Sequence, residues 1–205
     1  MTKSTKVPAQ KINAVFAALE TRLIGCLSFD LQVQAGQLVN FIARTSNDLC
    51  NAAQKKMTDT DFEFIAHRIA TINTNGVGLD QVKTCGKVVN LINAFALDQE
   101  KWLCSFLKIT TLSTLEHGGS LTVREMVCSL SKVALRDNQT WAVREGFSSY
   151  STYSVGTGSS QAAQCRQAFR MFNFYDGFVK GGKDNAPQLT AYGEANLRGL
   201  VFKNK

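Results

Sequence analysis

Apolar residues recur at intervals of three and four along most of this chain, and that spacing constrains its fold more than any other feature. A helix turns once every 3.6 residues or so, and such intervals therefore place the apolar side chains on one helical face. Proline, the residue that interrupts helices, occurs only twice among the 205 residues. The spacing predicts helices over residues 8–27, 37–57, 62–72, 79–96, 102–116 and 122–136.

The residues between these segments are of the types that begin and end helices. His117-Gly118-Gly119 is a stop for the fifth helix, because glycine readily adopts the left-handed conformation that follows a helix. Thr122 and Glu125 have the spacing of a capping box at the start of the sixth helix. Ile109-Thr110-Thr111 is a β-branched run, which leaves open a break within the fifth helix.

The composition changes after Asp137. Eleven of the sixteen residues from 146 to 161 are Gly, Ser or Thr, which predicts a loop. A further helix is expected from about residue 160 to residue 176, and Thr190 is placed to cap a short last helix.

These patterns predict a mainly α-helical fold. We expect one compact helical domain over residues 1–205, with a looser, loop-containing C-terminal third. Its expected parts are a basic arm (1–11), a helical core (12–137) and a basic, aromatic-rich C-terminal region (138–205).

The chain lacks the sequence pattern of a membrane span or a secretory signal. Lysines precede the first apolar segment, but Glu20 and Arg22 interrupt that segment, and no run of eighteen apolar residues occurs. The six cysteines include no Cys-x-x-Cys pair. We therefore expect them to be small buried side chains in a cytoplasmic protein with no membrane association.

Enzyme and metal chemistry have little support in the sequence. The motifs Gly-x-Ser-x-Gly, His-Glu-x-x-His and Gly-x-x-x-x-Gly-Lys-Ser/Thr are absent. Two histidines, His67 and His117, are available to a metal. Asp59, Asp61 and Glu63 cluster where a helix begins, a position that favours acids through the helix dipole. We expect no catalytic activity, no metal and no cofactor.

Positive charge and aromatic rings concentrate in the same part of the chain. The net charge is +7, and residues 121–205 carry eleven basic side chains against six acidic ones. Nine of the 19 aromatic residues lie between positions 141 and 178. Aromatic rings stack on unpaired bases and cations bind phosphates, and the combination therefore indicates a single-stranded DNA partner bound without sequence preference.

The candidate DNA-binding residues come from the basic arm, the aromatic-rich region and the basic C-terminus. They are Lys3, Lys6, Lys11, Arg144, Tyr150, Tyr153, Arg166, Arg170, Phe174, Tyr175, Lys180, Lys183, Lys203 and Lys205. On a helix through 160–176, the four-residue spacing of Arg166, Arg170 and Phe174 predicts a ridge with two guanidinium groups and one exposed ring. In the alternative, the C-terminal helix buries Phe174 and Tyr175, and both arginines are solvated.

Two other functions are open from the sequence. Residues 112–136 have the order helix, glycine-containing turn, helix, with Arg124, Lys132 and Arg136 on the later helix, as in helix-turn-helix proteins that bind duplex DNA. Alternatively, the aromatic cluster is an interface of a virion protein or of a host-takeover protein that binds no nucleic acid. The apolar segment 79–107 fits a core or a subunit interface, and we expect a homo-oligomer.

The basic arm, the loop with Tyr150 and Tyr153, and the run from Arg166 to Tyr175 (RQAFRMFNFY) together resemble a known class of proteins. They are similar to the small, basic, single-stranded-DNA-binding transcription regulators of lytic tailed phages of the Schitoviridae type. The resemblance implies coating of single-stranded phage DNA in the bacterial host cytoplasm. It also implies a role in transcription or DNA replication, with a phage RNA polymerase or replication proteins as partners.

Overall fold

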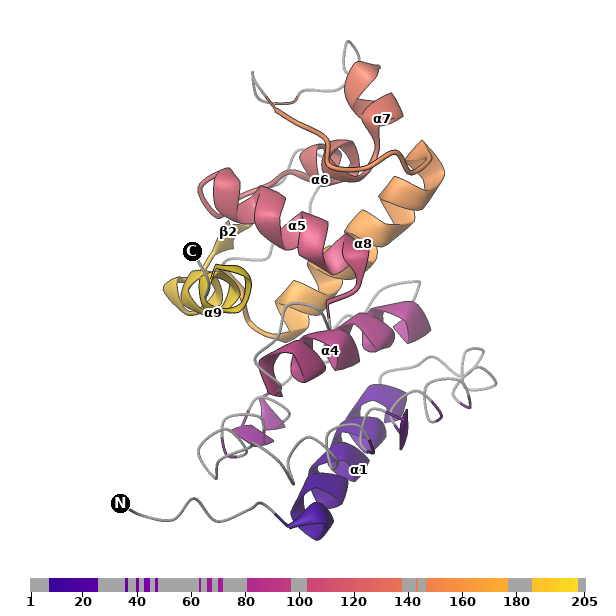
Figure 1. The fold of residues 1–205 in the computed structure, drawn as a ribbon, viewed down its shortest axis with the longest axis vertical. Helices are drawn as coiled ribbons and strands as arrows, with labels where there is room; N and C mark the ends of the chain where they lie inside the picture. Colours follow the sequence, from indigo (N-terminus) through magenta and orange to yellow (C-terminus); the bar gives the residue numbers. More distant parts are fainter. Residues whose placement is uncertain are drawn as a thin grey trace. The chain divides into compact units, whose positions relative to one another are not determined.

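The computed structural model describes residues 8–25, 36, 40, 43–44, 47, 63, 66–67, 70–71, 81–96, 103–137, 143, 147–176 and 186–202 (Figure 1). The chain divides into two compact units, Met1–Trp102 and Leu103–Lys205, and each is described by itself. The described residues form seven helices and one two-stranded sheet. The mainly α-helical fold predicted from the apolar spacing is therefore confirmed.

The first unit contains α1 (Ala9–Gly25) and α4 (Gln81–Ala96). The side chains that α1 buries are Ile12, Phe16, Leu19 and Leu23, which have the predicted spacing of three and four. These two helices confirm the predictions over 8–27 and 79–96, whereas the helices predicted over 37–57 and 62–72 lie mostly outside the described residues.

The apolar residues of α4 are buried inside the protein. Cys85, Val88, Val89 and Leu91 are completely shielded from solvent. The Cys85 thiol lies 4.0 Å from the carbonyl oxygen of Leu23 on α1. For the part of the apolar segment 79–107 that lies in α4, this burial favours a core over a subunit interface. No helix in the described part of the chain is long and apolar enough to cross a membrane.

The second unit is built around four helices. They are α5 (Ser105–Glu116), α6 (Val123–Leu130), α8 (Val155–Met171) and α9 (Ala191–Val201), and α6 packs on α8 while α9 packs on α5 (Figure 1). A short helix, α7 (Lys132–Arg136), follows α6. β1 (Tyr175–Asp176) pairs antiparallel with β2 (Gln188–Leu189), with Tyr175 opposite Leu189.

The ends of α5 and α6 follow the predicted pattern. Gly118 and Gly119 have positive φ angles of 71° and 81°, and the Gly119 N–H donates to the Thr114 carbonyl at 2.8 Å, which closes α5. The capping box is formed: the Glu125 N–H donates to Thr122 Oγ1 at 3.0 Å, and the Thr122 N–H donates to Glu125 Oε2 at 2.8 Å. Both predictions are confirmed.

Helix α5 is continuous through Ile109-Thr110-Thr111, so the break that the β-branched run left open does not occur. Thr110 and Thr111 are fully buried. Packing on α6, α8 and α9 stabilises the helical conformation here and outweighs the weak local preference of β-branched residues.

Helix α8 begins at Val155, five residues before its expected start near residue 160. The Ser154 side chain caps it by accepting a hydrogen bond of 3.2 Å from the Thr157 N–H. Gly158 is buried on α8, and a Cβ atom added there would lie 3.4 Å from Val127 Cγ1 of α6. Gly158 therefore serves close helix packing, and the loop predicted over 146–161 ends at Ser154.

Helix α8 ends at Met171 rather than at residue 176. Asn173 has a left-handed φ of 57°, and the Phe174 N–H donates to the Phe169 carbonyl at 3.0 Å. This is the hydrogen bond of a helix stop in which asparagine takes the usual position of glycine. The residues after Asn173 consequently leave the helix and enter β1. The division suggested at residue 137 falls inside the second unit, because α6 packs directly on α8.

Candidate nucleic-acid interface

The ridge expected from Arg166, Arg170 and Phe174 is not formed. Phe174 is completely buried, and Arg166 is 7% exposed. Because α8 ends at Met171, Phe174 does not continue the arginine face of the helix. Its ring centroid lies 5.9 Å from that of Tyr192 on α9, so the alternative is correct in that the C-terminal helix covers Phe174. It is wrong about Arg166, which it expected to be solvated and which is buried.

Tyr175 is also buried rather than available for stacking. Burial raises the pKa of its phenol, while the nearby Thr114 hydroxyl and Arg166 guanidinium act in the opposite direction. The Thr114 hydroxyl approaches the phenol without the geometry of a hydrogen bond. Burial likewise lowers the pKa of Arg166, and the nearby Tyr175 opposes this effect. Arg166 and Tyr175 therefore belong to the interior of the second unit.

The other candidate residues fall into three groups. Lys11 is exposed on α1, and Tyr150 is exposed in the segment before α8. Tyr153 and Arg170 are half-buried. The candidates that lie outside the described residues are Lys3, Lys6, Arg144, Lys180, Lys183, Lys203 and Lys205.

The segment that carries Tyr150 and Tyr153, residues 148–154, alternates in exposure with a period of two. The half-buried positions are Ser149, Ser151 and Tyr153. The exposed position before each of them is Ser148, Tyr150 and Thr152, respectively. Such alternation is typical of an extended chain that covers a surface with one side and faces solvent with the other. We call Ser148, Tyr150 and Thr152 the outer face.

Main-chain hydrogen bonds hold this segment against the junction of α6 and α7. The Tyr150 N–H donates to the Ser129 carbonyl at 2.9 Å, and the Lys132 N–H donates to the Ser151 carbonyl at 3.0 Å. Ser131 and Thr152 form an antiparallel bridge next to the second of these bonds. The backbone of Tyr150 is therefore fixed next to the first residues of α7.

Aromatic contacts anchor the segment at both of its ends. The ring centroid of Phe147 lies 4.4 Å from that of His117 in an edge-on contact. The Tyr153 ring lies 4.7 Å from the Phe106 ring, and its hydroxyl shares a hydrogen bond of 3.2 Å with Ser105 Oγ. Tyr150, between the two anchors, is 42% exposed. The backbone that carries the exposed Tyr150 side chain is thus held on both sides.

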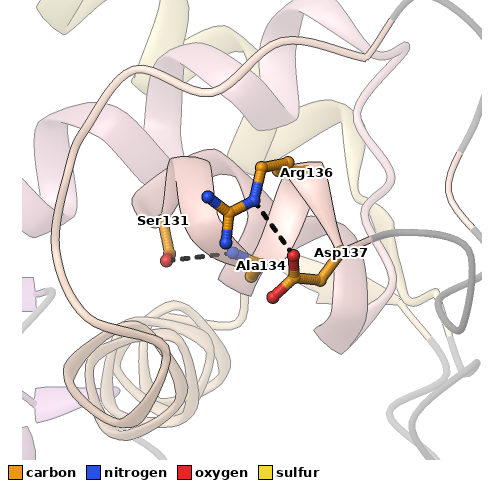
Figure 2. Close-up of polar contacts among 4 residues, drawn as sticks. All are labelled: Ser131, Ala134, Arg136 and Asp137. Atoms are coloured by element: carbon orange, nitrogen blue, oxygen red, sulfur yellow. Dashed lines mark hydrogen bonds and ion pairs between the residues drawn. The ribbon is translucent and has the colours of Figure 1, made fainter.

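Helix α7 carries two exposed cations, Lys132 and Arg136, and Figure 2 shows Arg136 with the helix cap. Ser131 Oγ accepts a hydrogen bond of 3.3 Å from the Ala134 N–H and so caps the helix. Lys132 and Arg136 are exposed and stand four residues apart, on one side of α7. The Arg136 Nε atom lies 3.1 Å from Asp137 Oδ1, and these two side chains are 75% and 54% exposed. An ion pair with this exposure is screened by water and is therefore weak.

Lys132 and Arg136 are not among the residues that the sequence predicted to lie with Tyr150. The sequence placed both on the later helix of a helix-turn-helix. That later helix is divided at Ser131 into α6 and α7, and every residue of α6 from Glu125 to Leu130 is buried. A recognition helix has to present a face to the major groove, and the burial of α6 argues against that alternative.

Three of the cysteines are buried, in agreement with their expected role as small apolar side chains. Cys85, Cys128 and Cys165 are fully shielded from solvent, and Cys104 is partly so. Burial, together with the nearby Glu125, raises the pKa of the Cys128 thiol to about 11. Within the described ranges, no three His, Cys, Asp or Glu side chains are grouped so as to hold a metal.

No protein-family model, curated protein or solved structure matches this chain. The resemblance to phage regulators therefore depends on the sequence features alone. A function has to be argued from the exposed residues of the α7 region and the outer face.

Proposed function

We propose that the Leu103–Lys205 unit binds single-stranded DNA largely without sequence preference. In this proposal the Tyr150 ring stacks on an unpaired base, and Lys132 and Arg136 bind the neighbouring phosphates. Stacking is available to every base, and phosphate contacts carry no sequence information. The observation that carries the proposal is the hydrogen bond between the Lys132 N–H and the Ser151 carbonyl, which joins the backbone next to the exposed Tyr150 to the helix that carries two exposed cations.

The exposure of Tyr150 is unusual within this unit. Among the described residues, three large apolar or aromatic side chains are exposed: Val133, Tyr150 and Tyr192. Val133 and Tyr150 belong to the two segments that the backbone hydrogen bonds join. Because the backbone at Tyr150 is already held by its bond to Ser129, stacking of the ring on a base orders only the side chain, which favours binding.

The biological setting of the proposal comes from the resemblance to phage regulators. In that setting the protein coats single-stranded DNA in the cytoplasm of a bacterial host and acts in transcription or replication. A phage RNA polymerase or replication protein is then a partner, and several copies of the chain bind along one strand.

A second candidate function is a protein interface of a virion or host-takeover protein. The exposed side chains Val133 and Tyr150 favour it, because apolar and aromatic residues are enriched at the centres of protein interfaces. This candidate needs no nucleic acid and differs from the first in its lack of salt-sensitive DNA binding.

Fluorescence anisotropy of labelled single-stranded and duplex oligonucleotides, each at two salt concentrations, separates these functions. We expect tighter binding of the single strand and a marked loss of affinity at the higher salt concentration. Absence of binding to either oligonucleotide at low salt would contradict the proposal and favour the protein interface. Equal, salt-sensitive binding of both oligonucleotides would indicate that the protein binds polyanions in general.

A further inference from the structure

The hydroxyl groups of residues 148–154 fall into two classes. On the inner side, Ser149 Oγ donates to the carbonyl oxygens of Ser129 and Ser151 at 3.3 and 3.1 Å. The half-buried Tyr153 hydroxyl is bonded to Ser105, whereas the exposed Ser154 hydroxyl caps α8 and is bonded to Thr157. The inner hydroxyls therefore hold the segment in place.

The hydroxyls of the outer face differ from the inner ones in their hydrogen bonding. Within the part of the chain that the structure describes, the side chains of Ser148, Tyr150 and Thr152 make no hydrogen bond. All three are exposed, and the backbone beneath them is fixed by the bonds to Ser129 and Lys132. They are thus ordered polar groups that a ligand can reach at the cost of displacing surface water.

The spacing of these groups suits a linear ligand. Residues two apart in an extended chain lie about 6.6 Å apart, and Ser148 and Thr152 are therefore separated by about 13 Å, with Tyr150 between them. A stacked DNA strand rises about 3.4 Å per nucleotide, so this distance corresponds to about four nucleotides. Serine and threonine hydroxyls are common partners of phosphate and sugar oxygens in DNA complexes.

We propose that the outer face is an uncharged contact track for the sugar–phosphate backbone of a bound single strand, in which Ser148 and Thr152 hydrogen-bond to the backbone on either side of the base stacked on Tyr150. This inference rests on the proposed function and assigns contacts additional to the cations of α7. Neutral hydroxyls displace no condensed counterions. Their contribution to affinity is therefore independent of salt, unlike that of Lys132 and Arg136.

The test compares variants by anisotropy with a labelled single-stranded oligodeoxythymidylate over a range of salt concentrations. Ser148→Ala combined with Thr152→Val removes both hydroxyls at nearly constant shape. We expect about tenfold weaker binding at every salt concentration, with the slope of log affinity against log salt unchanged. Ser159→Ala combined with Ser160→Ala removes two exposed hydroxyls from α8 and should leave affinity unchanged.

A second variant separates hydrogen bonding from shape. Ser148→Thr combined with Thr152→Ser keeps both hydroxyls and should bind like the wild type. Suppose that the wild type binds and that Tyr150→Ala weakens binding. Normal binding by the hydroxyl-free variant, Ser148→Ala combined with Thr152→Val, would then show that the track is wrong and leave the proposed function unaffected. A changed salt slope in the hydroxyl-free variant would also overturn the track. If the wild type does not bind, both proposals fail together.

Discussion

The main-chain N–H of Lys132 donates a hydrogen bond of 3.0 Å to the carbonyl oxygen of Ser151. This bond joins the start of α7 to the segment before α8, across nineteen positions of sequence. It places an exposed cation next to the residue that follows the exposed Tyr150. The proposed DNA site depends on this pairing, because neither segment alone contains both a stacking ring and the cations.

The cations of α7 should control the salt dependence of DNA binding. We expect Lys132→Gln combined with Arg136→Gln to lower the magnitude of the slope of log affinity against log salt by about 1.4, since each phosphate contact to a single strand contributes about 0.7. Anisotropy titrations at several salt concentrations measure this slope.

Arg198 provides the matched control for Arg136. It lies 2.7 Å from Glu194 on α9, in an exposed ion pair similar to that of Arg136 with Asp137. Arg198→Gln should leave the slope unchanged. The same effect per removed charge in the α7 and α9 variants would mean that the cations act through net charge rather than at a site.

Gly193 should be essential for the packing of α9. A Cβ atom added there would lie 2.5 Å from the Phe174 carbonyl oxygen and 2.8 Å from its Cα atom, a backbone that cannot easily shift. We expect Gly193→Ala to lower the free energy of unfolding by about 2 kcal/mol or more, measured by urea denaturation.

Gly199 on the same helix has the opposite environment. No atom lies within 4 Å of a Cβ added there, and we expect Gly199→Ala to raise the free energy of unfolding by up to about 1 kcal/mol. Destabilisation by both variants to the same extent would show that the contact with Phe174 is not the cause.

The Cys128 thiol should make the protein less stable at alkaline pH. Its pKa is about 11 in the folded protein against an ordinary value of 9.0 for a thiol, and between these two pH values only the folded protein keeps the proton. Stability is thus unaffected below pH 9 and falls as the pH rises toward 11, by about 2 kcal/mol for this group.

Urea denaturation at pH 8 and pH 11 measures this loss, with Cys128→Ala as the comparison. The cavity in the variant lowers stability at both pH values, so the informative quantity is the difference between them. The buried Tyr175 phenol adds a loss of the same sign in both proteins. The difference between the two pH values should therefore be smaller in Cys128→Ala than in the wild type, but not zero. An identical difference would exclude Cys128 as a contributor.

The parts of the fold that depend on neighbouring residues in sequence could be predicted from the sequence. The positions of α1 and α4 follow from apolar spacing, and the capping box of Thr122 and Glu125 and the stop at Gly118 follow from residue type. Each of these features is determined within one or two helical turns.

The features that the sequence did not predict depend on distant contacts or on a single backbone angle. The start of α8 depends on Gly158 packing against Val127, and its end depends on the left-handed conformation of Asn173. Because of that end, Phe174 is covered by α9 and is removed from the expected ridge. The proximity of Tyr150 to Lys132 likewise arises from the bridge between Ser131 and Thr152.

The central claim is that Tyr150 stacks on an unpaired base, and the most direct test compares Tyr150→Ala with Tyr192→Ala. The two tyrosines are 42% and 44% exposed, and Tyr192 lies on α9, apart from α7 (Figure 1). Measured by anisotropy with labelled single-stranded DNA, Tyr150→Ala should weaken binding by about tenfold to a hundredfold, as expected for the loss of one base–aromatic stack. Tyr192→Ala should bind like the wild type. Unchanged affinity of Tyr150→Ala, or an equal loss in both variants, would contradict the claim.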